Sequence, residues 1–226
     1  MLESAFKAYN EKRYAEAIEL FKELIPSHPS AITSLAYMYE HGEGLEVDLA
    51  KAHTLYEQAA ASEEPMALYN LALMYADGKG VEHDQFRAFE LMLKAAILEL
   101  PQAQFDIALR LEHGLGCLQN YSESAFWYEE AAKRGHGEAF NNLGVLYKDS
   151  LGVEQNYERA FLCFSRAADM GIAEAEYNLG LMHDQGLGIE QDSDKALEWC
   201  RKAAHHGHIK ASQIIRSLQE DGKIVF

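Results

Sequence analysis

The chain has few cations, few cysteines and few prolines, and these shortages exclude several classes of protein. Its 226 residues include 20 Lys and Arg against 36 Asp and Glu, which gives a formal net charge of −16. Nucleic acids and anionic membranes both attract clustered Lys and Arg, so this acidity argues against either as a partner. Hydrophobic residues still make up 48% of the chain, so we expect a folded protein with a buried core.

Long hydrophobic runs and paired cysteines are also missing. No stretch approaches the roughly 18 apolar residues of a transmembrane helix. Charged residues are spread through the first 21 positions, which excludes the apolar core of a signal peptide. The three cysteines Cys117, Cys163 and Cys200 are an odd number without CxxC spacing, so no disulfide framework is expected. We therefore expect a soluble protein of the reducing cytoplasm.

A period of 36 residues organises the chain from residue 30 to residue 207. An alanine pair, a single alanine and a glycine pair each recur at this spacing, and only Ser150 departs from it by replacing a glycine. The alanine pairs are Ala59-Ala60, Ala95-Ala96, Ala131-Ala132, Ala167-Ala168 and Ala203-Ala204. Self-similarity at a fixed period of this length predicts an array of stacked structural units.

Each unit predicts two helices with a glycine turn between them. In the second unit, apolar residues from Ala67 to Tyr75 recur at helical spacing, and those from Ala88 to Ala96 do so again. Gly78 lies in the intervening turn, where glycine tolerates a positive φ. A column of Asp or Asn precedes every second helix and is predicted to cap it: Asp48, Asp84, Asn120, Asn156 and Asp192.

Stacking is required because a single 36-residue hairpin is smaller than the roughly 40 residues that fold without extra support. We therefore predict one solenoid domain over residues 1–226. Residues 1–29 form a divergent N-terminal hairpin, residues 30–207 form five repeats, and residues 208–226 supply a capping helix to about Leu218 and a short tail. Units close at Gly135, Gly171 and Gly207, or break before a proline in the first two cases.

The repeated unit resembles the Sel1-like repeat, a relative of the tetratricopeptide repeat. Its pattern is A-x-x-x-L-[AG]-x-x-Y-x-x-G-x-G-[VIL]-x-x-D followed by A-x-x-x-Y-x-x-A-A, and residues 1–29 look more like a tetratricopeptide repeat. The fourth unit carries the pattern at Ala139, Leu143, Gly144, Tyr147, Gly152, Val153, Asn156, Ala160, Phe164, Ala167 and Ala168. The resemblance implies an all-α fold, a right-handed α/α superhelix, and a non-enzymatic adaptor role in protein complexes.

In related superhelices the first helix of each pair lines a concave groove. The repeat register then assigns the groove to columns that start at positions 30, 33, 34, 37, 40 and 41. The predicted peptide-binding residues are Tyr37, Tyr69, Asn70, Leu73, Phe105, Asp106, Leu109, Asn141, Asn142, Val145, Tyr177, Asn178 and Leu181. An Asn amide both donates and accepts, so it can pair with the backbone of an extended peptide. The same side chains can instead cap or brace the neighbouring unit, and both interpretations stay open.

Charge predicts the kind of segment that this groove would accept. The six columns contain eight acidic residues and one basic residue, Lys148. Clamps for a C-terminal carboxylate use Lys and Arg, so this groove should favour a neutral or basic segment of a partner protein. Contact through the outer helices or through self-association is an alternative, and the oligomeric state stays open. A hydrolase on the same scaffold would require titratable groups to converge, such as His113 beside Glu112 or Asp149.

Other chemical motifs are weak. The cluster His205, His206 and His208 lies at a helix end, where His suits the helix dipole, and it has no obvious fourth zinc ligand. The three cysteines occupy apolar columns, which predicts packing roles. The G-x-G pairs follow helices and lack the further residues of a phosphate loop. We therefore predict no catalytic residue, no metal and no cofactor.

Overall fold

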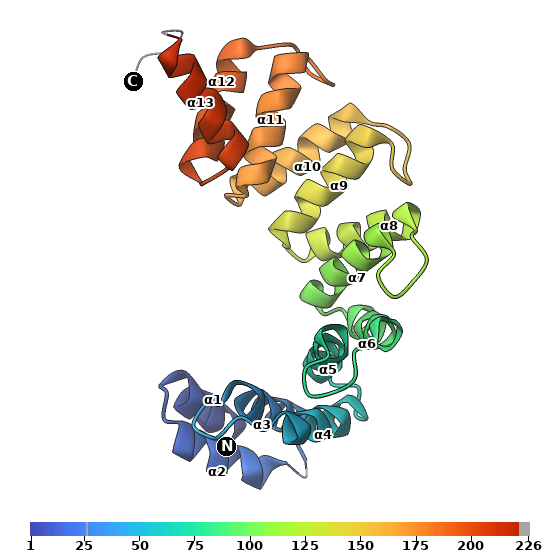
Figure 1. The fold of residues 1–226 in the computed structure, drawn as a ribbon, viewed down its shortest axis with the longest axis vertical. Coiled ribbons are helices and arrows are strands. Elements are labelled where there is room, and N and C mark those ends of the chain that lie inside the picture. The colour runs from blue at the N-terminus through green and yellow to red at the C-terminus, as the bar shows by residue number, and fades with distance from the viewer. Residues whose placement is uncertain (26, 222–226) are drawn as a thin grey trace. The chain divides into compact units, whose positions relative to one another are not determined.

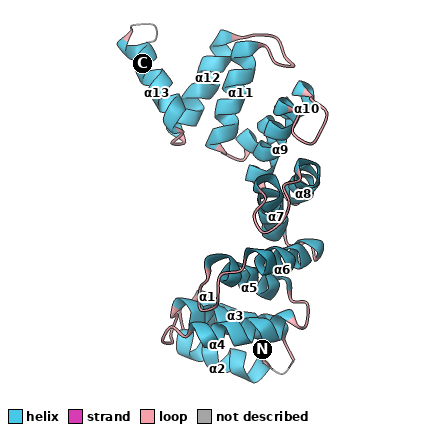
Figure 2. Ribbon diagram, turned by 45° about the vertical axis from the view of Figure 1, so that its right-hand side comes forward, coloured by secondary structure: helices cyan, strands magenta, loops and turns pink. Residues whose placement is uncertain are grey.

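The fold is described here from a computed structural model, for residues 1–25 and 27–221. This part of the chain forms thirteen α-helices joined by loops and contains no strand (Figure 2). The chain divides into two compact units, Met1–Gln119 and Asn120–Phe226. The division falls inside the third repeat, between its two helices. The expectation of one continuous domain over residues 1–226 stays a prediction.

The first unit contains seven helices (Figure 1). The helices are α1 (Leu2–Asn10), α2 (Tyr14–Leu24), α3 (Pro29–His41), α4 (Leu49–Ala60), α5 (Pro65–Asp77), α6 (Gln85–Ile97) and α7 (Pro101–His113). Consecutive helices pack together, and α3 also contacts α5 across the intervening helix. The predicted N-terminal hairpin is formed by α1 and α2 around the fully buried ring of Phe21.

The second unit contains six described helices (Figure 1). They are α8 (Tyr121–Lys133), α9 (Gly137–Asp149), α10 (Tyr157–Asp169), α11 (Ala173–Gln185), α12 (Ser193–His205) and α13 (Ile209–Glu220). The predicted closing helix is α13, whereas the end of the predicted tail, residues 222–226, lies outside the described residues. Tyr128 and Phe164 are fully buried and fill the space between neighbouring hairpins.

The predicted N-caps are confirmed in all five repeats. The side chain of each capping Asp or Asn accepts a hydrogen bond from the backbone N–H three residues later, at 2.8 to 3.1 Å. Each bond satisfies one of the N–H groups that the first turn of a helix leaves without a partner. The second helices therefore begin where local sequence predicts.

The glycine pairs act at two different places. The first glycine of a pair ends the first helix in a left-handed conformation, and Ser150 takes the same conformation with a φ of 56°. The second glycine lies against the start of the preceding second helix. A Cβ at Gly116 would lie 2.0 Å from the carbonyl oxygen of Gln85, and one at Gly152 would lie 2.3 Å from the carbonyl carbon of Tyr121. These contacts allow adjacent hairpins to approach closely.

Three further left-handed positions were missed from the sequence: Lys12 in the N-terminal hairpin, with a φ of 59°, and two positions where repeats close. Gly135, Gly171 and Gly207 have the positive φ expected where a repeat closes. The equivalent positions in the first two repeats are Glu63, with a φ of 56°, and Glu99, with a φ of 63°. The chain keeps the same turn before Pro65 and Pro101, so these glutamates adopt a conformation that favours glycine.

Candidate protein-binding face

First helices of three successive hairpins meet at one hollow in the first unit. Its volume is about 240 Å³, and its walls come from α1, α3 and α5. The lining residues, called the aromatic pocket below, are Phe6, Tyr9, Thr33, Ser34, Tyr37, Met66 and Asn70. Five of them belong to the predicted groove columns, and two come from the N-terminal hairpin. The structure thus brings together predicted residues that are more than 30 positions apart in sequence.

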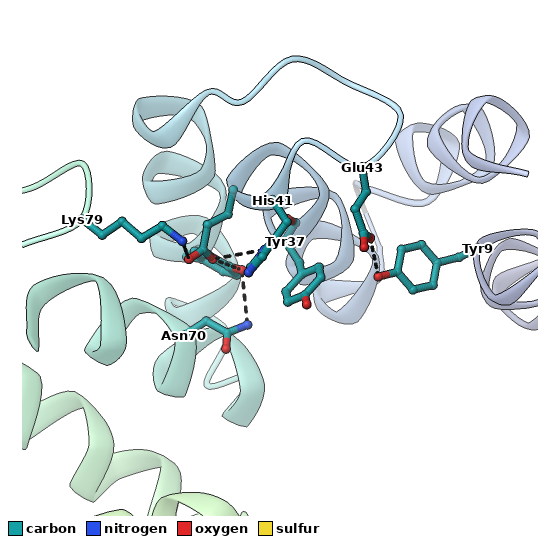
Figure 3. Close-up of polar contacts among 8 residues, drawn as sticks. Tyr9, Tyr37, His41, Glu43, Asn70 and Lys79 are labelled. Atoms are coloured by element: carbon teal, nitrogen blue, oxygen red, sulfur yellow. Dashed lines mark hydrogen bonds and ion pairs between the residues drawn. The ribbon is translucent and has the colours of Figure 1, made fainter. Parts of the chain in front are cut away.

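A half-buried carboxylate, Glu40, organises a polar cluster that includes the pocket residue Asn70. The Tyr56 hydroxyl donates to Oε2 of Glu40 at 2.9 Å, and Lys79 Nζ donates to Oε1 at 2.8 Å (Figure 3). The amide of Asn70 in turn donates to the Tyr56 hydroxyl at 3.3 Å. Burial raises the pKa of Tyr56, and the charge of Glu40 raises it further, so this hydroxyl stays protonated as a donor.

The asparagine column braces neighbouring repeats. Asn70 on α5 donates to Tyr56 on α4, and Asn142 on α9 donates to Tyr128 on α8 at 3.1 Å. Each bond links the first helix of one repeat to the second helix of the repeat before it. Of the two interpretations of this column, bracing is therefore observed, whereas peptide binding stays a prediction.

Some repeats have no hydroxyl at the position of Tyr56 and Tyr128. There, the polar residue on the following first helix forms a different hydrogen bond. Met92 occupies the tyrosine position of the second repeat, and Asp106 accepts instead from the hydroxyl of Tyr69 at 2.7 Å. Phe164 occupies that position in the fourth repeat, and Asn178 donates to Oδ1 of Asn141 at 3.0 Å. Both replacement bonds connect successive first helices. Burial and the charge of Asp106 raise the pKa of Tyr69.

The apolar groove residues contribute to packing and remain partly accessible. All the side chains in this group are half-buried: Leu73, Phe105, Leu109, Val145 and Leu181. Tyr177 is also half-buried and stacks on His208, with 4.3 Å between the ring centroids. Tyr37 is 37% exposed and is therefore the most accessible aromatic residue of the predicted set.

A larger hollow lies in the second unit between α11, α12 and α13. Its volume is about 430 Å³, and Tyr177 and Leu181 form part of its wall. The remaining lining residues are Gly180, Asp184, Ser193, Asp194, Ala196, Leu197, Cys200, Ile214 and Leu218. These lining residues include two carboxylates, Asp184 and Asp194, and they include no Lys, Arg or His. This α11–α13 hollow is apolar inside and acidic at its polar positions.

Ion pairs reduce the acidity of parts of the predicted groove. Lys79, which lies outside the six columns, pairs with Glu40, and Lys148 lies 3.6 Å from Asp149. By contrast, Asp184 and Asp194 have no ionic partner in the described residues. Asp184 belongs to the predicted groove columns and Asp194 lies outside them, so both carboxylates leave uncompensated negative charge beside the α11–α13 hollow.

The histidine cluster diverges to separate partners. His206 Nδ1 lies 2.9 Å from the carboxylate of Glu176, whereas His208 Nε2 lies 2.9 Å from that of Glu174. His208 also caps α13, since its Nδ1 accepts from the backbone N–H of Ala211 at 3.1 Å. Over residues 1–25 and 27–221, no three or more His, Cys, Asp or Glu side chains are grouped to hold a metal ion.

The environments of the three cysteines and of His113 are typical of residues with a structural role. Cys117, Cys163 and Cys200 are free thiols, and burial raises the pKa of Cys163 to about 11. Burial raises the pKa of Cys200 as well, so both thiols resist forming the nucleophilic thiolate. His113 Nδ1 lies 2.9 Å from the carbonyl oxygen of Leu109 in its own helix.

No helix in the described part of the chain combines the length and hydrophobicity needed to cross a membrane.

Comparison with known proteins places this geometry in a family. The Sel1 repeat family profile matches residues 29–63, 65–99, 101–136, 138–172 and 173–208. A Sel1 repeat protein from Oxalobacter formigenes is 27% identical, with a TM-score of 0.90 over 97% of this chain and 91% of the other. The protective antigen c5321 of uropathogenic Escherichia coli is 30% identical, with a TM-score of 0.86 over 92% of this chain and 45% of the antigen.

A third solved structure supports the fold alone. The Sel1 repeat protein from Klebsiella pneumoniae is 21% identical, with a TM-score of 0.51 over 87% of this chain and 96% of the other. A comparison with curated protein sequences gives no significant match.

Proposed function

Because the chain belongs to the Sel1 repeat family, we propose that it is a non-enzymatic scaffold that holds a neutral-to-basic segment of a partner protein against its first helices. Sel1 repeat proteins generally mediate protein–protein interactions, and the scaffold is typically non-enzymatic. The compartment proposed for this interaction is the cytoplasm, which fits three free cysteines.

The α11–α13 hollow is the observation that supports this function most directly. Protein interfaces concentrate their binding energy in side chains that fill well-packed pockets surrounded by a polar rim. The hollow offers apolar walls to one such side chain, while Asp184 and Asp194 are available to neighbouring Lys or Arg residues. A segment with an apolar anchor beside basic residues complements both features.

The experiment is a selection of random displayed peptides against the full chain, followed by affinity measurements on the enriched peptides. Enrichment of Lys or Arg beside an apolar residue is expected. Asp184→Asn combined with Asp194→Asn should weaken binding roughly twofold to thirtyfold, since each exposed charge pair contributes about 0.2–1 kcal/mol. Both changes preserve side-chain size and remove only charge.

A matched control separates this effect from the loss of total charge. Glu158→Gln combined with Asp169→Asn removes the same two charges from exposed positions on α10 and should leave affinity unchanged. Enrichment of acidic peptides, or equal weakening by both pairs of substitutions, would contradict the proposed function. Truncation of Asn142 and Asn178 is a poorer test, because both side chains brace the fold.

The outer helices carry one feature that favours a second candidate, self-association through the second helices. Phe126 on α8 and Leu162 on α10 occupy equivalent positions in adjacent repeats and are 54% and 63% exposed. Exposed apolar side chains that recur at equivalent positions of adjacent repeats offer material for an interaction surface. Sedimentation of the chain and of Phe126→Ser with Leu162→Ser tests this candidate. A monomer whose sedimentation is unchanged by both substitutions would contradict it.

A further inference from the structure

We propose that the aromatic pocket of the first unit binds one cationic side chain, arginine or lysine, of the partner segment. This inference rests on the proposed function and adds a specific recognition site to it. The pocket lies wholly within the first unit, on α1, α3 and α5, and is lined by Phe6, Tyr9 and Tyr37 together with four smaller or flexible residues. Three features of these residues favour a cation.

The three rings are each held by another ring outside the pocket. Phe6 contacts the buried ring of Phe21 edge-on at 5.4 Å between centroids, and Tyr9 contacts Tyr14 at 5.9 Å. Tyr37 stacks on His41 at 3.9 Å (Figure 3). Rings whose orientation is already restricted lose little conformational freedom when a ligand binds. Aromatic faces attract ammonium and guanidinium groups through the ring quadrupole.

Two carboxylates beside the pocket have only neutral hydrogen-bond donors among the described residues. Glu43 accepts from the Tyr9 hydroxyl at 2.5 Å (Figure 3). Glu64 accepts from the Thr33 hydroxyl at 2.9 Å and from the backbone N–H of Ala67 at 2.6 Å. Tyr9 and Thr33 both line the pocket, so each carboxylate lies one hydrogen bond away from a lining side chain. Because burial and Glu43 raise the pKa of Tyr9, its hydroxyl remains a neutral donor.

Lys79, a cation of the first unit, is already engaged by a carboxylate. Lys79 pairs with Glu40 at 2.8 Å, and Glu40 also accepts from Tyr56 (Figure 3). Glu43 and Glu64 therefore remain to attract a cation from outside. An acidic side chain would be repelled by these carboxylates, and a neutral polar side chain would gain neither the charge attraction nor the ring–cation contact.

The test titrates three blocked tripeptides, acetyl-Gly-Arg-Gly-amide, acetyl-Gly-Lys-Gly-amide and the citrulline analogue, into the isotopically labelled full chain. NMR shift changes are expected in α1, α3 and the start of α5 for the two cationic peptides. Citrulline keeps the shape of arginine but is neutral, so its affinity should be lower by at least about threefold. Equal binding of the citrulline peptide, or shift changes confined to other helices, would overturn the proposal.

Three variants separate the contribution of the Tyr37 ring to cation binding from that of the Glu43 carboxylate. Tyr37→Leu should weaken both cationic peptides about threefold, whereas Tyr37→Phe keeps the ring and should bind them like the native chain. Glu43→Gln retains side-chain size and should also weaken both peptides. If Tyr37→Leu does not fold, Tyr37→Phe and Glu43→Gln decide the proposal alone. Unchanged affinity in Glu43→Gln would then reject it.

The outcomes also distinguish this pocket from the proposed function as a whole. Binding of the arginine peptide without any Asp184- and Asp194-dependent ligand would support the pocket and reject the wider proposal. Selected peptides that depend on Asp184 and Asp194, with no binding of the tripeptides, would reject the pocket alone.

Discussion

At the scale of single residues, one buried side chain decides the hydrogen bonds of the next repeat. Tyr56 and Tyr128 present a hydroxyl to the following first helix, and Asn70 and Asn142 bind it. Phe164 presents none, and Asn178 binds Asn141 instead. A buried amide without a partner would cost about 1–3 kcal/mol, so each repeat uses the partner that its neighbour provides.

Tyr128→Phe tests this coupling. Loss of the hydroxyl removes the bond from Asn142 and should lower the free energy of unfolding by about 1 kcal/mol. In a double-mutant cycle with Asn142→Ala, measured by urea denaturation, the two effects should be less than additive because both variants remove the same bond. Fully additive effects would show that the two side chains are independent.

His183 is a buried group whose protonation should affect stability. Its Nδ1 is buried and has no hydrogen-bond partner among the described residues. Burial lowers the pKa of His183 from its ordinary value, and the charge of Lys195 lowers it further. The unfolded chain therefore binds a proton more readily than the folded chain at mildly acidic pH.

The expected result is a loss of stability as the pH falls below about 6.5, the ordinary pKa of His. His183→Leu, which places the residue found at the equivalent position 111, should reduce this loss. The slopes of unfolding free energy against pH in the native chain and in His183→Leu should differ by at most about 1.4 kcal/mol per pH unit, the limit for one proton. His205→Leu, at an exposed position, is the control, and equal slopes of unfolding free energy against pH in both variants would contradict the prediction.

At the scale of elements, helix ends control where each hairpin turns. The Asp or Asn caps begin the second helices, and left-handed residues end the first helices and close the repeats. Three positions use a residue with a Cβ where the other repeats use glycine, namely Glu63, Glu99 and Ser150. These ends are therefore the strained members of an otherwise regular set.

Glu63→Gly combined with Glu99→Gly should stabilise the first unit by about 0.5–1 kcal/mol per site, because glycine adopts the left-handed conformation without a Cβ clash. Thermal and urea unfolding of the full chain measure the gain. Glu82→Gly is the matched control, since Glu82 is an exposed loop residue of the same unit without a positive φ, and it should be neutral or destabilising. An equal change in unfolding free energy in the double variant and in Glu82→Gly would argue against backbone strain at Glu63 and Glu99.

At the scale of the whole molecule, the net charge of −16 should give folding and binding opposite responses to salt. Like charges repel one another most in the compact state, so screening should stabilise the fold. The same screening weakens the attraction between Asp184 and Asp194 of the α11–α13 hollow and a basic segment.

Raising NaCl from about 0.05 M to about 0.5 M shortens the Debye length severalfold and should increase the free energy of unfolding. Over the same range, the affinity for a selected basic peptide should decrease. Urea denaturation and fluorescence anisotropy measure the two responses, and a neutral osmolyte at matched osmolality is the control. Binding that is insensitive to salt would contradict an electrostatic contribution from Asp184 and Asp194.

The fold was largely predictable because its signals are local. The 36-residue period is visible along the chain itself, while Asp48 and its equivalents as caps and the glycines at helix ends act within a few residues. The left-handed turns at Glu63 and Glu99 were missed, since neither residue type marks such a turn. The available signal was the repeat register, because Glu63 and Glu99 occupy the positions equivalent to Gly135.

The sequence by itself determined the repeat, the helices and the family, because periodicity and capping depend on neighbouring residues. Only the tertiary structure decided which residues of the predicted face are braces and which line a hollow. Asn70 reaches Tyr56 and Lys79 reaches Glu40 across different repeats, while Tyr9 joins Tyr37 from a hairpin outside the regular array. Such contacts depend on the three-dimensional distance between side chains, which a one-dimensional pattern does not contain.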